Sequence, residues 1–291
     1  MSDNQSKDNG RWNDGWQDNR LDLREKVAVV TGGARGIGRA TCIALARKGI
    51  KAVAVVDQLD ELVSFVHGAN ERLDRKVLVA YRGDVTDRDF RRDVFAQMEE
   101  RYGPMSICVP AAGITRDRLA VKIDRETGEA NIYSEEEFRR VIEVDLTAPI
   151  YWALETVASV ARDRHRRGLR RWEPAERVQG CVILIGSVSS AGNRGQISYA
   201  TAKAGLDGAQ ATLAIEAIFY GVRCAVIHPG YTDTAMVRAM GEEFVSEQIL
   251  PKTQLRRLIM PEEIADAICF MIRNSAVSGE LWADAGFHPS V

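Results

Sequence analysis

Residues 31–38 read Thr-Gly-Gly-Ala-Arg-Gly-Ile-Gly, directly after an apolar run at 27–30 and directly before a helical pattern. Glycines at this place let the backbone turn tightly and approach a pyrophosphate closely. The amino end of the following helix then offers free N–H groups and a positive dipole end to an anion. A glycine motif alone is a weak signal, but in the first strand-to-helix turn of an alternating chain it predicts a dinucleotide site. The residues assigned to this loop are Gly32, Arg35, Gly36, Ile37 and Gly38.

Short apolar runs alternate with helical patterns along the rest of the chain. The runs are continuously apolar, as expected for strands buried on both faces. This repetition implies right-handed crossovers, so the predicted fold class is α/β, a single Rossmann-type doubly wound parallel β-sheet with helices on both faces. The expected strands are 27–31, 52–57, 77–82, 106–111, 181–187, 222–228 and 281–283. The expected helices are 37–48, 59–73, 88–101, 135–162, 199–220 and 261–273.

Composition and charge narrow the function classes. The 291 residues are 45% hydrophobic, an ordinary composition for a globular protein. The formal net charge of −2 shows no basic excess that would call for nucleic acid or an anionic membrane as partner. No apolar run approaches the roughly 18 residues that span a bilayer. The five cysteines are scattered and form no CxxC pair, which argues against disulfides or a zinc site and favours a reducing cytoplasm.

The domain organisation follows from a few polar segments. Residues 1–24 lack the apolar core of a signal peptide and predict a disordered arm, followed by one domain over 25–291. Two stretches look like inserts. Residues 122–133 predict a small hairpin, and residues 162–178 hold seven Arg against three acids, with Gly168 and Pro174 opposing one unbroken helix.

Acidic residues after the second and third strands bear on the cofactor. Asp57 ends the second strand, where a carboxylate accepts hydrogen bonds from ribose hydroxyls and repels a 2′-phosphate, which favours NAD over NADP. Arg35 favours NADP instead, because a basic side chain in the glycine loop can reach a 2′-phosphate. Asp84 and Val85 follow the third strand. They are candidates for adenine contacts, and Asp84 is equally a candidate N-cap for the helix from Arg88.

A second motif carries acid–base chemistry. Residues 199–203 read Tyr-Ala-Thr-Ala-Lys on a predicted helix, where positions i and i+4 share a face. An ammonium near a phenol stabilises phenolate and lowers the tyrosine pKa, so that Tyr199 can act as general acid or base with Lys203 beside it. Ser187, at the end of the preceding strand, can hydrogen-bond a substrate carbonyl or alcohol. On its own this spacing is common by chance.

At this point the chain resembles the classical short-chain dehydrogenase/reductase family, over about residues 25–286. The stretches 113–117 and 192–199 look most like its 3-oxoacyl-carrier-protein reductase branch. The resemblance rests on residues 31–38, 84–85, 111–113, Ser187, Tyr199 with Lys203, 229–230 with Thr234, and 284–286.

The resemblance implies roles for these residues. Tyr199 would be the catalytic acid/base, Lys203 would bind the nicotinamide ribose and lower the Tyr199 pKa, and Ser187 would polarise the substrate oxygen. Hydride would move between nicotinamide and the substrate carbon, and no metal is implied. Further cofactor contacts are expected from Ala112, Gly113, Pro229, Gly230, Thr232 and Thr234.

Two departures from the family pattern stand out. Residues 110–113 read Pro-Ala-Ala-Gly where the family has Asn-Asn-Ala-Gly, so two amides that brace the central strand are missing. The family's fourth catalytic residue, an Asn in the long helix, aligns with Asp145. An Asp can accept the same hydrogen bond but adds charge near Lys203, so it either keeps the proton relay or retunes it.

The leading functional hypothesis is an NAD-dependent oxidoreductase of a secondary alcohol/ketone pair. A 3-oxoacyl thioester reductase, acting on a carrier-protein or CoA thioester, is the enzymatic alternative, and a non-catalytic NAD-binding sensor or scaffold is the alternative of another class. Apolar residues in 234–258 predict a substrate lid or an ordinary amphipathic cover. The Arg-rich stretch 162–177 is a candidate docking surface for an acidic carrier protein, or else a solvated or subunit-contact loop. A homodimer or homotetramer in the cytoplasm is expected.

Overall fold

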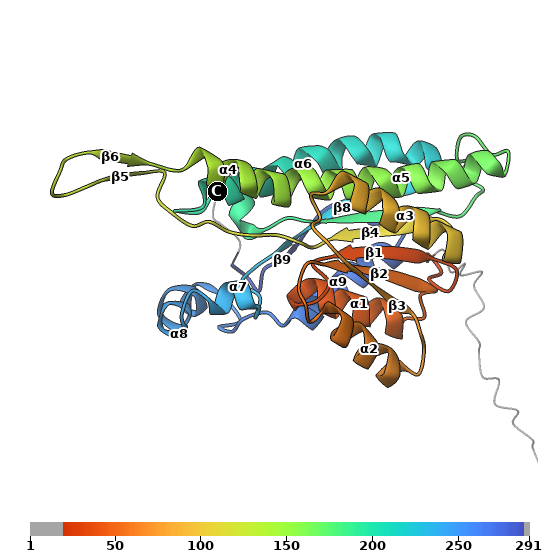
Figure 1. Cartoon of the computed structure of the whole chain (residues 1–291), viewed down its shortest axis with the longest axis horizontal. Coiled ribbons are helices and arrows are strands. Elements are labelled where there is room, and N and C mark those ends of the chain that lie inside the picture. The colour runs from red at the N-terminus through yellow and green to blue at the C-terminus, as the bar shows by residue number, and fades with distance from the viewer. Residues whose placement is uncertain (1–19, 288–291) are drawn as a thin grey trace, which may run out of the picture.

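A seven-stranded parallel sheet runs through the middle of the protein in the order β3-β2-β1-β4-β7-β8-β9 (Figure 1). The computed structural model describes residues 20–287. The order reverses direction between β1 and β4, the arrangement of a doubly wound sheet, which confirms the predicted fold class. The strands are β1 Val27–Thr31, β2 Ala52–Asp57, β3 Leu78–Arg82, β4 Met105–Pro110, β7 Gly180–Ile185, β8 Val222–Pro229 and β9 Gly279–Ala283, each within two residues of its predicted bounds.

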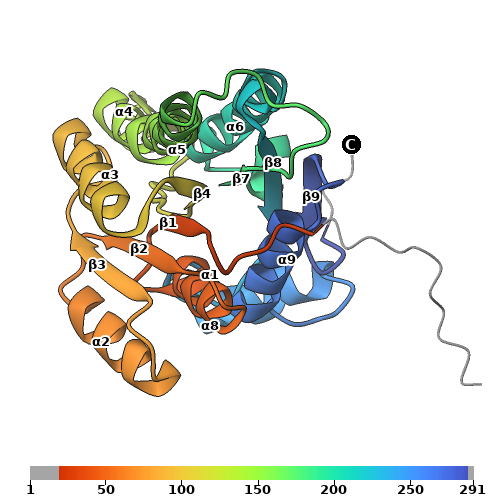
Figure 2. The same ribbon diagram turned by 90° about the vertical axis from the view of Figure 1, so that its right-hand side faces the viewer.

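Helices cover both faces of this sheet (Figure 2). One face carries α1 Gly36–Arg47, α2 Leu62–Leu73 and α9 Pro261–Arg273; the other carries α3 Arg88–Tyr102, α4 Glu135–Ile142, α5 Ala148–Arg166 and α6 Ile197–Glu216. A buried apolar cluster lies under each layer, which explains why the strands read as continuously apolar. No helix within residues 20–287 has the length and apolar character needed to cross a membrane.

The predicted helix 135–162 is helical throughout, but it is not α-helical throughout. It divides into α4, a π-helical turn at Glu143–Thr147 and α5. Such turns insert one residue into the helical ladder and occur often at functional sites. Here the turn carries Asp145, which is fully buried. This π-helical turn is too short for the hydrophobic periodicity of the sequence to reveal it.

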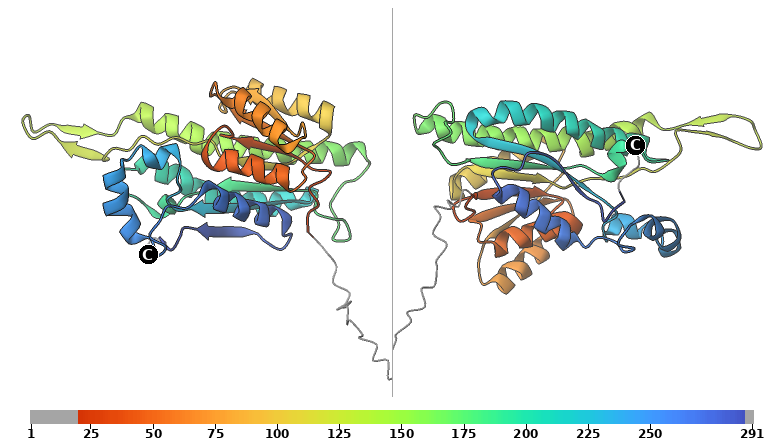
Figure 3. Two further views of the ribbon diagram at one scale, coloured as in Figure 1. Left: turned by 90° about the horizontal axis from the view of Figure 1, so that it is seen from below. Right: turned by 180° about the vertical axis from the view of Figure 1, so that it is seen from behind.

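The two expected inserts differ in form. The first is the predicted hairpin, with antiparallel strands β5 Val121–Ile123 and β6 Ala130–Ile132. It projects beyond the body of the protein (Figures 1 and 3). The second leaves α5 at Arg166 and returns to β7 as an irregular loop. Its Arg164 side chain is buried and forms a bidentate pair with Glu176, at 2.6 and 3.0 Å.

The position of this second insert bears on carrier binding. Residues 167–179 connect the end of α5 to the first residue of β7, so they lie at the amino edge of the sheet (Figure 1). Tyr199 lies at the opposite, carboxyl edge. That position argues against 162–177 as a docking surface for an acyl carrier, because the acyl group must reach Tyr199.

The predicted arm, residues 1–24, includes residues that belong to the folded core. Leu21 and Leu23 are buried against it, and the Leu21 N–H donates to the Arg273 carbonyl at the end of α9. The segment from Leu21 therefore belongs to the folded body, because its two leucines bury apolar surface. Residues 1–19 of the predicted arm lie outside the described part of the chain.

Two further short helices, α7 Ala235–Arg238 and α8 Glu242–Phe244, lie with a π-helical turn at Val245–Ile249 and a 3₁₀ turn at Leu250–Lys252 within the segment expected as a lid. Short 3₁₀ turns also follow β7 at Val188–Ala191 and α6 at Ala217–Tyr220. The lid segment sits below the hairpin at the carboxyl edge of the sheet (Figure 3).

Candidate active site

A cavity of about 330 Å³ opens along the carboxyl ends of β1 to β4. In open α/β sheets, ligands bind at this edge where the strand order reverses. The walls come from the turn after each strand. They include Gly32, Arg35, Gly36, Ile37, Gly38, Asp57, Asp84, Val85, Ala112, Gly113, Tyr199, Lys203 and Thr234.

The glycine loop has the geometry of an anion cradle. Gly32 has a φ of +63°, and a Cβ there would lie 2.7 Å from the Ala112 backbone nitrogen, so only glycine fits. Gly36 has a φ of +51° and begins α1. Within residues 20–287, no side chain caps the amino end of that helix at Arg35, which leaves its first N–H groups to a ligand. The loop thus fits a pyrophosphate, as its sequence predicts.

Asp57 is fixed at the wall of this cavity. One carboxylate oxygen accepts the Ala34 N–H at 3.0 Å and the other accepts the Leu59 N–H at 3.2 Å. Arg35 pairs instead with Glu61, with Nη2 2.7 Å from a carboxylate oxygen. The guanidinium is therefore engaged by an acid rather than presented alone to a phosphate.

The structure corrects one alternative for the third strand-to-helix turn. Asp87, rather than Asp84, caps α3, because its side chain accepts the Asp89 and Phe90 N–H groups. Asp84 accepts the Thr86 N–H at 2.9 Å and pairs with Arg140 at 3.2 Å. Val85 lies beside it in the cavity wall, which leaves both residues in place for the adenine role.

Four side chains converge beside the cavity, on three elements. Ser187 follows β7, Tyr199 and Lys203 lie one turn apart on α6, and Asp145 lies on the π-helical turn. The Lys203 Nζ lies 5.4 Å from the centre of the Tyr199 ring, donates to the Ile185 carbonyl at 3.0 Å and lies 3.7 Å from an Asp145 oxygen. Tyr199 hydrogen-bonds with the Ser187 side chain.

The lowering of the Tyr199 pKa expected from Lys203 is not the net effect in this structure. Burial raises the pKa of Tyr199, the Asp145 carboxylate raises it further, and the bond to Ser187 opposes the change. Burial lowers the pKa of Lys203 as well. The phenol is accordingly held neutral, the form that can donate a proton to a substrate oxygen.

Asp145 occupies the place expected for the family Asn. One oxygen accepts the Ile114 N–H at 2.9 Å, the bond that an amide oxygen would also accept. Burial raises the pKa of Asp145 to about 6, against the opposing effect of Lys203. A Cβ at Gly113 would lie 3.1 Å from its other oxygen, so the carboxylate packs directly against that glycine.

A second, smaller cavity of about 110 Å³ adjoins the first, and Ile37, Ile185, Tyr199, Thr234 and Met236 line both. Its wall includes the expected Ser187, Pro229, Gly230 and Thr232. The apolar side is Met236, Val237 and Met240, from the segment expected as a lid.

Sequence reasoning missed a polar network in this second cavity. The Gln196 side chain accepts from Ser189 Oγ at 2.9 Å and donates to Asp117 at 2.8 Å. Asn193 also donates to Gln196, at 2.9 Å. The Ser189 hydroxyl is thereby engaged by Gln196. The only signal in the sequence that could have revealed this network is the closeness of Asn193 and Gln196 to Tyr199.

Comparisons with known proteins agree with this geometry. Residues 26–244 match the family model for short chain dehydrogenase. The chain is 33% identical to an acetoacetyl-CoA reductase of Rhizobium meliloti, over 86% of this chain and 92% of that protein. It is 31% identical to a 3-oxoacyl-acyl-carrier-protein reductase of Escherichia coli, over 89% and 96% respectively. A dehydrogenase crystal structure from Agrobacterium tumefaciens superposes with a TM-score of 0.77 at 24% identity, covering 93% of this chain and 98% of that one.

Proposed function

Because this chain belongs to the short-chain dehydrogenase family, whose members are NAD(P)-dependent oxidoreductases, we propose that it reduces the 3-keto group of an acyl thioester. The observation that carries the proposal is the meeting of Ser187, Tyr199 and Lys203 where the two cavities join. The relatives named as reductases of acetoacetyl-CoA and of a 3-oxoacyl carrier support the thioester over a simple secondary alcohol. The simple alcohol/ketone pair, favoured by the sequence, becomes the second candidate.

The residues of the first cavity fit a nicotinamide dinucleotide. The α1 amino end and the glycine loop would hold its pyrophosphate, Asp57 its adenosine ribose, and Thr234 the nicotinamide end. When bound in its reduced form, it would supply the hydride that adds to the keto carbon.

The side chains of the chain itself supply the remaining chemistry. Ser187 and Tyr199 donate hydrogen bonds to the keto oxygen and so stabilise the negative charge that develops there. Tyr199 then gives its proton to that oxygen, and solvent restores the proton, so one ketone, one hydride and one proton yield one alcohol. Lys203, 5.4 Å from the Tyr199 ring, stabilises the transient phenolate.

We propose NAD as the preferred cofactor. The Asp57 carboxylate stands at the cavity wall, where it would repel a 2′-phosphate. Arg35 is paired with Glu61, which reduces its value as a phosphate ligand. Both features support the sequence-based preference for NAD over NADP.

The segments that carry Thr115, Asn193 and Gln196 of the second cavity wall support an anionic handle on the substrate. Arg118 and Gln196 bridge two backbone segments there, and the Arg118 N–H donates to the Gly195 carbonyl at 2.8 Å. Arg116, Arg118 and Arg194 are exposed on these segments. Their cations would attract the phosphates of CoA or an acidic carrier, in place of the arginines at 162–177.

The test compares initial rates with acetoacetyl-CoA and with a free 3-keto ester, each with NADH and NADPH. We expect kcat/KM to favour the thioester and NADH, each by about tenfold or more. Arg194→Glu should raise KM for the thioester alone, whereas Arg101→Glu, at the far end of α3, is the control. Equal kcat/KM for both substrates would contradict the thioester proposal and favour a simple ketone. NADH binding without turnover of any ketone would favour a sensor or scaffold.

A homodimer or homotetramer and a cytoplasmic location remain predictions. Exposed apolar side chains on the outer face of α5 and α6, among them Tyr151, Leu154 and Ile215, support self-association through these helices. Light scattering over a dilution series would measure it, and a monomer at every concentration would contradict it.

A further inference from the structure

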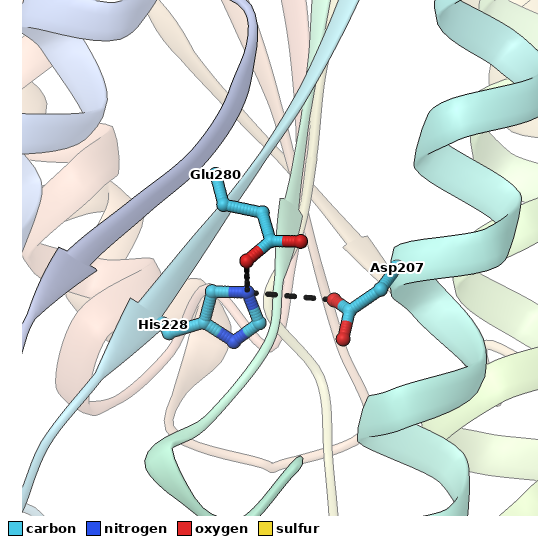
Figure 4. A group of neighbouring side chains, drawn as sticks. All are labelled: Asp207, His228 and Glu280. Atoms are coloured by element: carbon cyan, nitrogen blue, oxygen red, sulfur yellow. Dashed lines mark ion pairs between the residues drawn. The ribbon is translucent and has the colours of Figure 1, made fainter. Parts of the chain in front are cut away.

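Behind the catalytic segment, three ionisable side chains point toward one another from three elements (Figure 4). Asp207 lies on α6, one turn after Lys203, His228 lies near the end of β8, and Glu280 lies on β9. The His228 Nε2 is 3.4 Å from an Asp207 oxygen and 3.7 Å from a Glu280 oxygen. All three potential ligand atoms lie within 4.8 Å of one another.

The buried histidine distinguishes this cluster from an ordinary group of acidic side chains. His228 is 0% exposed, and within residues 20–287 its Nε2 has no hydrogen-bond partner, although it faces both carboxylates (Figure 4). Asp207 Oδ1 has no hydrogen-bond partner there either. Buried polar atoms are nearly always satisfied, so an unsatisfied ring nitrogen aimed between two acids indicates a binding site.

The ring is held rigidly in this orientation. The Trp282 side chain stacks on it, with centroids 4.3 Å apart and planes at 14°. On its other side, a Cβ at Gly186 would lie 2.5 Å from Nδ1, so glycine makes room for the imidazole. A metal ligand needs this kind of fixed orientation.

We propose that Asp207, His228 and Glu280 bind a divalent cation of the zinc class. Zinc bonds of about 2.0–2.2 Å in tetrahedral geometry place neighbouring ligand atoms roughly 3.3–3.6 Å apart, close to the 3.4 and 3.7 Å observed. One imidazole with two carboxylates suits zinc, whereas calcium takes oxygen ligands. The cation would also offset the repulsion between the two acids. Water would complete the fourth position.

The remaining ring nitrogen supplies the supporting contact that metal-bound histidines usually make. His228 Nδ1 lies 3.2 Å from the Ser187 carbonyl oxygen and 3.3 Å from the Ser187 nitrogen. A cation on Nε2 leaves the proton on Nδ1, which then donates to that carbonyl. Without a cation, Nδ1 accepts the Ser187 N–H and Nε2–H faces the acids. The two states therefore differ in tautomer, and neither depends on the proposed function.

The experiment uses the full chain without an affinity tag, stripped of metal by a chelator and dialysed. Zn²⁺ is titrated by calorimetry, and Co²⁺ serves as a spectroscopic probe through its visible d–d absorption. We expect one Zn²⁺ per chain and tetrahedral Co²⁺ absorption. Asp207→Asn and Glu280→Gln should each weaken binding by about tenfold or more. Glu216→Gln, which changes an exposed acid on the same helix, should bind as the unchanged chain does.

A second readout separates the site from loss of fold. The nitrogen chemical shifts of His228 should move to those of an Nδ1–H, metal-bound ring when Zn²⁺ is added, while far-ultraviolet circular dichroism of every variant stays unchanged. Absence of stoichiometric binding, or equal affinity of the unchanged chain and Glu280→Gln, would overturn the proposal. In that case the histidine is an internal hydrogen-bonding group between Ser187 and the two acids.

Discussion

Asp145→Asn tests how the buried carboxylate beside Lys203 affects the protein. Burial raises the Asp145 pKa to about 6 from an ordinary value of 3.8, a difference of about two pH units. Each unit corresponds to about 1.4 kcal/mol, so the charged carboxylate lowers the free energy of unfolding by about 3 kcal/mol above pH 6. An acid with a raised folded-state pKa binds more protons when folded, so this penalty is absent below about pH 3.8 and grows as pH rises toward 6.

Comparing Asp145→Asn with the unchanged chain isolates the titration of the Asp145 carboxyl. Asn keeps the acceptor for the Ile114 N–H but cannot ionise. Any pH-independent effect of the change cancels in the difference between pH values. We expect the stability of Asp145→Asn relative to the unchanged chain to rise by about 2 kcal/mol between about pH 4.5 and about pH 7.5.

The assay is urea unfolding followed by circular dichroism at both pH values. Asp93→Asn, which neutralises an exposed acid on α3, is the matched control. The pH profile of ketone reduction should also change near pH 6 in Asp145→Asn, because the charge beside Lys203 and Tyr199 no longer varies. A stability difference that is the same at both pH values would refute a buried titrating carboxylate.

Three further changes have expected outcomes. Asp57→Ala should lower kcat/KM with NADH and raise it with NADPH, shifting their ratio by about tenfold or more, and an unchanged ratio in initial-rate assays would contradict its role. Arg164→Ala should destabilise by about 1.5–3 kcal/mol in urea unfolding, because it removes a buried side chain and its charged hydrogen bonds to the partly exposed Glu176, whereas Arg166→Ala at an exposed pair should cost about 1 kcal/mol or less; equal losses would argue against a special role of the Arg164 pair. Gly186→Ala should cost about 1–3 kcal/mol through contact with the imidazole behind it, while Gly208→Ala, whose Cβ meets nothing within 4 Å, should stabilise α6 by up to about 1 kcal/mol; similar effects of the two would contradict the packing described.

The sheet and the outline of the site follow from the sequence because they depend on local patterns. Each buried strand reads as an apolar run. The glycine loop and Ser187 each follow a strand, and Tyr199 and Lys203 share one face of a helix. Their convergence at one edge is a property of parallel sheets. The hairpin at 122–133 was also predictable, since its turn residues stand out.

What the sequence did not reveal depends on three-dimensional context. The π-helical turn that buries Asp145 changes the helical phase by one residue, which periodicity cannot resolve. The raised Tyr199 pKa comes from burial and from Asp145, which a Tyr–Lys spacing does not encode. Asp207, His228 and Glu280 meet only because α6, β8 and β9 pack side by side, and no motif spacing links them.

The most direct test of the proposed chemistry is the rate of NADH oxidation with acetoacetyl-CoA by Tyr199→Phe. This change removes only the hydroxyl that bonds with Ser187 and gives its proton to the substrate. We expect the rate to fall by about 100-fold or more, with NADH binding retained, because positioned proton transfer contributes at least that much. A rate within about twofold of the unchanged chain would contradict Tyr199 as the proton donor.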